Sequence, residues 1–293
     1  MSPPGGAFPA AKYLEFKGKS AARGAWSRRL ARCRETARFC CAQGVRAWEP
    51  PWMGRPCYVG CEMPRTIIIG DVHGCRDELA RLIEHVGFAS GDRVVMVGDL
   101  IVRGPDPCGT LDLLREIGAI SVRGNHEDRL LRWRAGRSDP RGEPLGELSK
   151  ETAQQLRKRD WAWLETLPYW LDLPEHELRV VHAGMIPGLP IERQDPHTLM
   201  YVRCLGRYGE PVERRGGKTL WGQTYQGPPH VVFGHNARSE AQMHAWATGI
   251  DTGAVYGGRL TAMVLHDGER VPPPASRAEV LVSVPSRRRY VGR

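Results

Sequence analysis

The sequence lacks long apolar runs, paired cysteines and a hydrophobic leader, and each absence argues against a class of protein. No run reaches the roughly 18 apolar residues that a membrane-spanning helix requires, so we expect no membrane partner. The eight cysteines include no C-x-x-C pair of the kind that binds structural zinc. The start has no apolar core of about 7–15 residues, which argues against a secretory signal. We therefore expect a cytoplasmic protein in which Cys75, Cys108 and Cys204 are reduced.

Positive charge is in excess, but it is concentrated in one part of the chain. Of the net charge of +9, residues 1–62 contribute +7, from eleven Lys and Arg against four Asp and Glu. We interpret this Cys-, Arg- and Pro-rich extension as disordered, or as a wrongly assigned start with Met63 beginning the natural chain. Organellar targeting and an ordered, partner-binding role, including RNA binding, are the alternatives. We expect one catalytic domain over 63–270 and a flexible basic tail over 271–293.

Five segments share one pattern, in which a short apolar strand ends in a glycine and a side chain that can bind a metal ion. The first is the β-branched run 66–69, which leads into Gly70-Asp71-Val72-His73-Gly74. The pattern recurs at 93–99, 119–127, 178–184 and 230–235. Because sites assemble at strand ends in α/β folds, the repetition indicates one shared centre with oxygen and imidazole ligands.

Helical spacing between these strands predicts alternating strands and helices, which is typical of a mainly parallel sheet. We expect helices over 76–86 and 106–117, a helix after His126, and a helix or helix pair over 147–167. Further strands are expected at 178–182, 230–235, 247–251 and 259–266.

Taken in order, the motifs resemble those of calcineurin-like metallophosphoesterases of the phosphoprotein phosphatase superfamily, whose pattern is GDxHG, GDxxDRG, GNHE, HAG and GH. Within it the chain is similar to the ApaH-like phosphatases, because residues 234–238 and 248–261 match the ending of that subgroup. The resemblance covers residues 64–268. It implies an α/β fold, a four-layer αββα sandwich with a dinuclear metal site at the strand ends, and places the segment 186–225 near the mouth.

The resemblance also implies a set of metal ligands with one bridging carboxylate, that of Asp99. The implied ligands are Asp71, His73 and Asp99 for the first ion and Asp99, Asn125, His182 and His235 for the second. A mixed set of oxygen and nitrogen donors suits Mn²⁺, our first choice, with iron, zinc or cobalt as alternatives. Two such ions clamp an in-line displacement in which a metal-activated hydroxide attacks phosphorus without a covalent enzyme intermediate.

Three further residues take catalytic roles by the same resemblance. Arg103 and Arg123 would bind the phosphate oxygens, which a guanidinium fork matches well. His126 would protonate the leaving oxygen, and the alternative is a buried histidine that positions Asn125.

One position departs from the superfamily pattern, because Val102 stands where protein phosphatases have an aspartate. That carboxylate supports the protonated catalytic histidine, and valine provides no such support. The departure favours the ApaH-like subgroup and a phosphoanhydride substrate, which could be polyphosphate, a dinucleoside polyphosphate or a capped RNA end. The capped RNA end is the one nucleic-acid partner that we expect. The alternatives are a Ser/Thr protein phosphatase and a pseudoenzyme that binds phosphate ligands without turnover.

Overall fold

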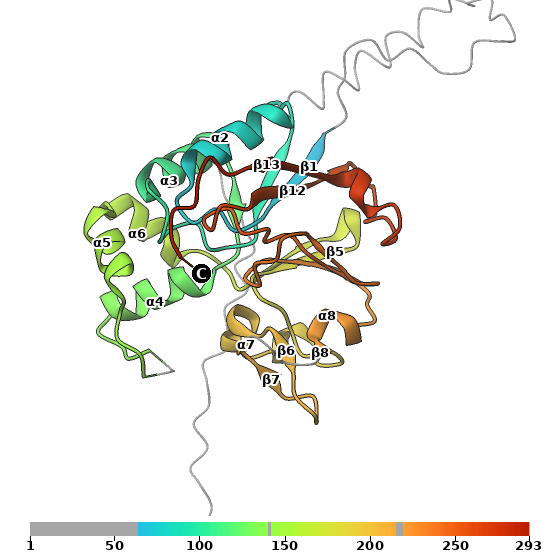
Figure 1. The fold of residues 1–293 in the computed structure, drawn as a ribbon. Helices are drawn as coiled ribbons and strands as arrows, with labels where there is room; N and C mark the ends of the chain where they lie inside the picture. The colour runs from blue at the N-terminus through green and yellow to red at the C-terminus, as the bar shows by residue number, and fades with distance from the viewer. Residues whose placement is uncertain (1–63, 140–141, 215–218, 293) are drawn as a thin grey trace, which may run out of the picture. The chain divides into compact units, whose positions relative to one another are not determined.

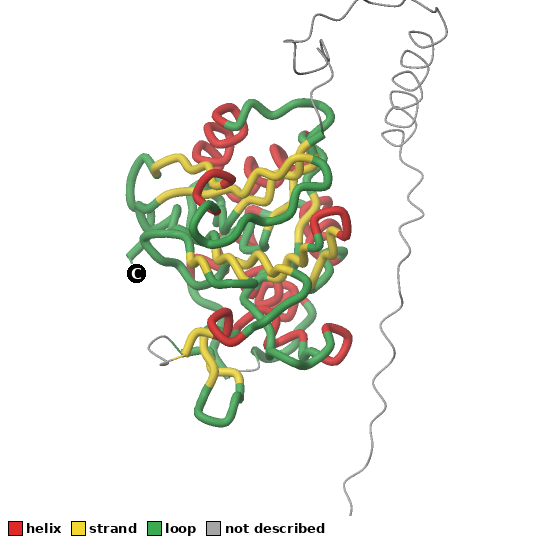
Figure 2. Tube along the Cα trace, turned by 90° about the vertical axis from the view of Figure 1, so that its right-hand side faces the viewer, coloured by secondary structure: helices red, strands yellow, loops and turns green. Residues whose placement is uncertain are grey.

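Two five-stranded β-sheets form the centre of the computed structural model, which describes residues 64–139, 142–214 and 219–292 (Figure 1). The first sheet has the strand order β13-β12-β1-β2-β3, and the second has the order β10-β11-β9-β5-β4. A small third sheet has the order β7-β6-β8. Seen at right angles, the strands gather in the middle of this unit, with helices above and below them (Figure 2).

The element bounds show how the chain alternates between the layers. The strands are β1 (Arg65–Ile69), β2 (Arg93–Met96), β3 (Ile120–Ser121), β4 (Trp170–Leu173), β5 (Leu178–Val181), β6 (Cys204–Leu205), β7 (Pro211–Val212), β8 (Thr219–Leu220), β9 (His230–Phe233), β10 (Gln242–Met243), β11 (Ala247–Gly249), β12 (Arg259–His266) and β13 (Leu281–Pro285). The α-helices are α2 (Arg76–His85), α3 (Pro107–Glu116), α4 (Asn125–Arg134), α5 (Glu147–Gln155), α6 (Lys158–Glu165), α7 (Pro196–Tyr201) and α8 (Trp221–Thr224). Short 3₁₀ helices are η1 (Pro174–His176), η2 (Ile191–Arg193) and η3 (Arg277–Val280).

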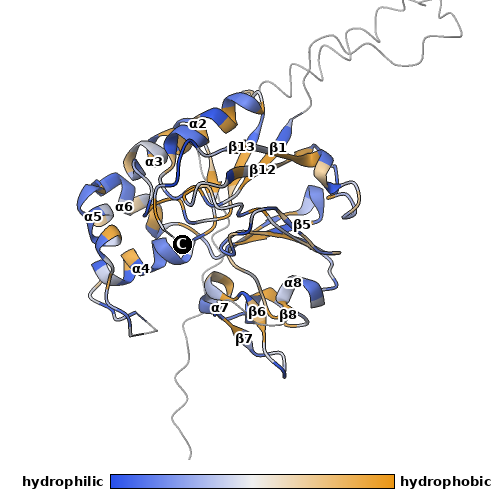
Figure 3. Ribbon diagram, in the orientation of Figure 1, coloured by the Kyte–Doolittle hydropathy of each residue, from blue (hydrophilic) through white to orange (hydrophobic). Residues whose placement is uncertain are grey.

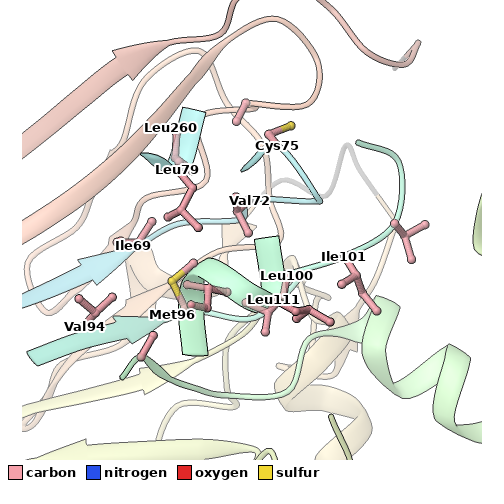
Figure 4. Close-up of a cluster of buried hydrophobic side chains, with 14 of the residues drawn as sticks. Ile69, Val72, Cys75, Leu79, Val94, Met96, Leu100, Ile101, Leu111 and Leu260 are labelled. Atoms are coloured by element: carbon pink, nitrogen blue, oxygen red, sulfur yellow. The ribbon is translucent and has the colours of Figure 1, made fainter. Parts of the chain in front are cut away.

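Strand β1 is buried on both faces, as its unbroken apolar run predicts for a central strand. Ile67 and Ile69 belong to the core cluster beneath the helices, whereas Ile68 belongs to the cluster between the two sheets. Figure 4 shows the first cluster, in which Ile69 lies among apolar side chains such as Leu79 of α2 and Leu111 of α3. Figure 3 shows the corresponding pattern in the ribbon, with apolar strands inside and mostly polar helix surfaces outside.

A third apolar cluster covers the outer face of the second sheet. Val231 and Phe233 of β9 pack there with Leu199 of α7 and Trp221 of α8. The order of layers is therefore helices, sheet, sheet, helices, which confirms the expected αββα sandwich. None of the helices in the described residues is long and apolar enough to cross a membrane.

The predicted helices agree with the structure to within one or two residues. The α3 helix has Asp106 as its N-cap, and the Asp106 carboxylate accepts the Gly109 N–H at 2.7 Å. The segment 147–167 is a helix pair, α5 and α6.

The prediction of a flexible tail after residue 270 is wrong for the described residues. Strand β13 pairs antiparallel with β12 and forms the edge of the first sheet. Without it, β12 would present a row of unpaired backbone N–H and C=O groups, which β13 satisfies while it buries Val284. The extension 1–62 and the interpretations made of it lie outside the described residues.

Candidate metal centre

Two sharp turns, one after β1 and one after β2, bring the first ligands together. His73 and Asp99 have positive φ angles of 48° and 49°, which non-glycine residues adopt rarely. The turns are joined by backbone hydrogen bonds: the His73 N–H donates to the Asp99 carbonyl and the Gly74 N–H to the Leu100 carbonyl, each at 2.8 Å. A Cβ atom on Gly104 would lie 2.1 Å from the His73 carbonyl oxygen, so this close approach requires glycine.

The Asp99 carboxylate lies at the centre of the cluster and is almost completely buried. Its Oδ1 accepts the backbone N–H of His126 at 3.1 Å and lies 3.4 Å from His182 Nε2. Its Oδ2 lies 3.5 Å from His73 Nε2. Burial by itself would raise the pKa of Asp99, but His182 and the other surrounding histidines hold it well below its ordinary value. An ionised carboxylate with both oxygens facing imidazoles suits a bridging role.

Two histidines are oriented by backbone carbonyls behind them. His73 Nδ1 lies 3.2 Å from the Ile101 carbonyl oxygen, and His182 Nδ1 lies 2.8 Å from the Val97 carbonyl oxygen. Each Nδ1–H can donate to its carbonyl, which leaves the Nε2 lone pair directed at the centre. Metal-binding histidines are commonly fixed by such a contact on the far side of the ring.

Two imidazole nitrogens converge on the side-chain oxygen of Asn125. Asn125 Oδ1 lies 3.0 Å from His182 Nε2 and 2.9 Å from His235 Nδ1. With its Nδ1–H directed at Val97, His182 presents a lone pair to the Asn125 oxygen. A positive centre, a proton or a metal ion, makes such a contact favourable.

The Asp71 carboxylate contributes an acceptor atom that has no hydrogen-bond partner. Its Oδ2 accepts the His235 backbone N–H at 3.0 Å, whereas its Oδ1 is buried and has no hydrogen-bond partner. Burial raises the pKa of Asp71 well above its ordinary value, and the nearby Asp251 and Asp99 raise it further. The donor set and the unpartnered oxygen therefore fit divalent cations.

Two groups of ligand atoms are close enough to hold an ion each, and they share Asp99. The groups are His73, Asp99 and His126, and Asp99, His182 and His235, with the ligand atoms of each group within 4.8 Å of one another. The structure thus brings five of the predicted site residues into two groups that meet at Asp99. Asn125 contacts the second group, and Asp71 reaches it through the His235 backbone.

In the described residues, no carboxylate accepts a hydrogen bond from the His126 ring. Its ring packs edge to face against His73, with centroids 5.1 Å apart, and its buried Nδ1 has no hydrogen-bond partner. Burial lowers the pKa of His126 well below its ordinary value, although the Asp99 charge opposes this. Val102 packs in the apolar cluster beneath the helices, so it contributes shape there and no charge.

The structure separates the two arginines that the sequence analysis treats alike. A small pocket, which we call the metal pocket, opens onto His73, Asp99, Asn125, His126 and His235. Arg103 also lines it: its Nη1 donates to His73 Nε2 at 2.9 Å, and its guanidinium lies over the Tyr256 ring at 5.5 Å. Arg123 instead donates to the Glu165 carbonyl at 3.0 Å and lies over the Tyr169 ring at 5.1 Å. It is not among the residues that line the pocket.

Three residues that the sequence analysis missed also line the pocket: Arg203, Asp251 and Tyr256. Arg203 Nη1 donates to the His235 carbonyl at 2.9 Å. Asp251 follows β11 as the other ligands follow their strands, a signal that could have identified it; burial raises its pKa. Arg203 lies in the 186–225 segment, where no motif marks it.

Glu127 fixes the backbone that carries Asp99. Its carboxylate accepts the backbone N–H groups of Asp99 and Leu100 at 2.9 Å and of Gly124 at 3.0 Å. Burial, with the neighbouring Asp99 charge, raises the pKa of Glu127 to about 8. The Glu of the GNHE motif therefore holds the Asp99 turn to the start of α4.

A cluster of carboxylates and imidazoles at the strand ends of an αββα sandwich defines a metal-dependent phosphoesterase, a hydrolase. The chain belongs to the calcineurin-like phosphoesterase family, whose model matches residues 64–262.

Similar proteins agree with this assignment. The chain is 30% identical over 230 residues to the asymmetrical bis(5'-nucleosyl)-tetraphosphatase PrpE of Oceanobacillus iheyensis, covering 70% of this chain and 90% of the relative. It is 32% identical over 234 residues to the PrpE of Halalkalibacterium halodurans, covering 71% and 93%. A crystal structure provisionally described as a diadenosine tetraphosphatase matches with a TM-score of 0.65 and 35% identity, covering 76% of this chain and 93% of that one.

Proposed function

We propose that this protein hydrolyses phosphoanhydride bonds, with dinucleoside polyphosphates as its main substrates and polyphosphate or capped RNA ends as related ones. The observation that carries the proposal is the convergence of carboxylate, amide and imidazole groups on Asp99, beside the guanidinium of Arg103. The tetraphosphatase names of relatives that are matched over about nine-tenths of their length support the substrate class. The absence of a carboxylate at Val102 also favours this class over phosphoproteins.

We propose two divalent ions, with Mn²⁺ first, held by the six side chains that the sequence analysis named: Asp71, His73, Asp99, Asn125, His182 and His235. When bound, such ions lower the pKa of water and polarise the phosphoryl group. The protein contributes the fixed orientation of the ligands, through backbone contacts such as that between His182 and Val97.

The remaining pocket residues act on the phosphate. Arg103 and Arg203 present guanidinium groups to the pocket. They would bind the phosphate oxygens while negative charge shifts between these oxygens during bond breaking. His126 would donate a proton to the leaving oxygen. That proton matters less for a phosphate leaving group than for a serine alkoxide, which fits a histidine without a carboxylate partner. The role of Arg123 remains a prediction that its position does not support.

We place the reaction in the cytoplasm, because the described cysteines Cys75, Cys108 and Cys204 are free thiols.

The test is a ³¹P NMR time course on the Mn²⁺-loaded full chain with diadenosine tetraphosphate, polyphosphate and a phosphoserine peptide in one mixture. We expect loss of anhydride resonances while the phosphopeptide persists. Turnover of the phosphopeptide alone would favour the protein phosphatase alternative. Bound metal without any turnover, measured by elemental analysis of the same sample, would favour the phosphate-binding pseudoenzyme.

A further inference from the structure

A second pocket, which we call the arginine pocket, has a volume of about 380 Å³, compared with about 40 Å³ for the metal pocket. Its charged lining residues are three arginines and two aspartates, namely Arg76, Arg287, Arg288, Asp77 and Asp106. Guanidinium groups are suited to phosphate because their donors match its oxygens in pairs. The three guanidinium groups, which outnumber the carboxylates by one, therefore suit an anionic ligand.

Two turns of the chain connect the arginine pocket to the metal pocket. After β1, His73 lines the metal pocket and Arg76, three residues later, lines the arginine pocket. After β2, Arg103 lines the metal pocket and Pro105, two residues later, lines the arginine pocket. The two pockets are therefore neighbours along both turns.

The C-terminal segment makes the third connection. Tyr256 lines the metal pocket, and its backbone forms an antiparallel bridge with Arg289. On either side of Arg289, Arg288 and Tyr290 line the arginine pocket. In Figure 1 this red segment continues from β13 past α2 toward the C-terminus.

The backbone of this basic segment is fixed while its side chains stay accessible. Glu78 Oε1 accepts the Arg287 backbone N–H at 2.9 Å and the Tyr290 hydroxyl at 3.0 Å. The Arg287 side chain is 58% exposed and reaches the Asp77 carboxylate at 2.8 Å. A segment anchored in this way holds cations at a defined place without burying them.

The ion pairs in this pocket are of the kind that a phosphate group can replace. Arg76 lies 3.8 Å from the Asp77 carboxylate and 4.0 Å from that of Asp106, and all three side chains are nearly half exposed. Exposed pairs at such distances contribute little to stability, so their exchange for an oxyanion costs little.

We propose that the arginine pocket binds the part of the substrate that lies beyond the phosphoryl group in the metal pocket, namely the polyphosphate chain of a dinucleoside polyphosphate. This inference rests on the proposed function. The metal pocket, at about 40 Å³, is far smaller than a small-molecule site usually is, so most of such a substrate lies outside it. The arginine pocket is within the range of about 300–1,000 Å³ that small-molecule sites span.

The test compares two double variants of the full-length, metal-loaded protein. Arg287→Ala/Arg288→Ala removes two cations from the pocket and keeps the backbone hydrogen bond to Glu78. Arg159→Ala/Arg270→Ala removes two exposed, ion-paired arginines elsewhere, whose side chains are 62% and 71% exposed. The readouts are kcat and KM for diadenosine tetraphosphate, and the inhibition constant of inorganic phosphate, a single group that can occupy the metal pocket without reaching the arginine pocket.

We expect the pocket variant to raise KM about tenfold, which corresponds to about 1.4 kcal/mol, with kcat and the phosphate inhibition constant unchanged. The Arg287→Lys/Arg288→Lys variant should recover part of the affinity that the alanine variant loses. Lysine keeps the positive charge but lacks the paired donors of the guanidinium fork. The control variant should behave as the wild type.

Equal KM values in the two alanine variants would overturn the inference and leave the proposed function intact, as would an equal rise in the phosphate inhibition constant. A wild-type protein that leaves diadenosine tetraphosphate intact would overturn the proposed function, and this inference with it.

Discussion

The metal pocket and the arginine pocket share three chain segments but differ in how their charged groups are held. Asp99 is 1% exposed and is fixed by backbone hydrogen bonds and surrounding imidazoles. Arg287 is more than half exposed and is held through its backbone, while its side chain pairs with one surface carboxylate. The comparison indicates a division of labour: buried, rigid ligands suit bond breaking, and exposed cations on an anchored segment suit recognition of an extended substrate.

The largest effect should come from the centre of the metal pocket. Asp99→Asn removes the ionised oxygens shared by the two ligand groups, so we expect kcat to fall by about three orders of magnitude, or about 4 kcal/mol. Bound metal, measured by elemental analysis, should fall in the same sample. Asp77→Asn, in the arginine pocket, is the matched control and should keep its metal. Full metal content in Asp99→Asn would contradict the bridging role.

Metal removal should lower the thermal stability of the fold, and it should do so by the same amount whether or not the arginine pocket is intact. The buried carboxylates of Asp71, Asp99 and Asp251 repel one another when no cation is bound. A ligand at 100 times its Kd stabilises the fold by about 2.7 kcal/mol. For a chain of this size, a chelator should therefore lower Tm by about 5–10 °C. The Arg287→Ala/Arg288→Ala variant should show the same shift, and a smaller one would mean that the arginine pocket contributes to metal binding.

A positioning residue should give an intermediate effect. Glu127→Gln replaces one acceptor oxygen with an NH₂ group that faces backbone N–H donors, so the Asp99 turn should loosen. We expect metal affinity to fall about 10–100-fold, measured by titration of the metal-free protein. Glu165→Gln, at an exposed position on α6, is the control. An unchanged affinity in Glu127→Gln would show that the turn holds its geometry without that carboxylate.

The smallest effect should be the response of KM to salt. It distinguishes the exposed charges of the arginine pocket from the buried charges of the metal pocket. Exposed charges are screened beyond about 10 Å at 0.1 M salt, whereas buried ones are screened much less. Raising NaCl from 0.05 to 0.3 M should therefore raise KM for diadenosine tetraphosphate about threefold and leave kcat unchanged. In Arg287→Ala/Arg288→Ala the rise in KM should shrink toward none. A fall in kcat with salt would instead place the screened charges in the metal pocket.

Local patterns were sufficient for much of the fold. The apolar runs and their glycine turns predicted β1, β2, β5 and β9, because each buried strand is a short contiguous run. The N-cap at Asp106 and the helix or helix pair over 147–167 were predicted for similarly local reasons. Strand β13 was missed because its pairing with β12 depends on a partner distant in the sequence, and the flanking Pro and Arg residues masked its alternation.

The sequence by itself determined the family and the sandwich, and it predicted the six metal ligands, because each predicted ligand comes soon after a short apolar strand that can be recognised locally. The tertiary structure decided which arginines face the pocket: motif position suggested Arg103 and Arg123 equally, but only Arg103 lines it, and Arg203 arrives from a segment without a motif. It also decided that the basic segment 287–290 lies beside the metal pocket. Where a long, flexible side chain points depends on packing and partners across the whole fold, and no local pattern records those.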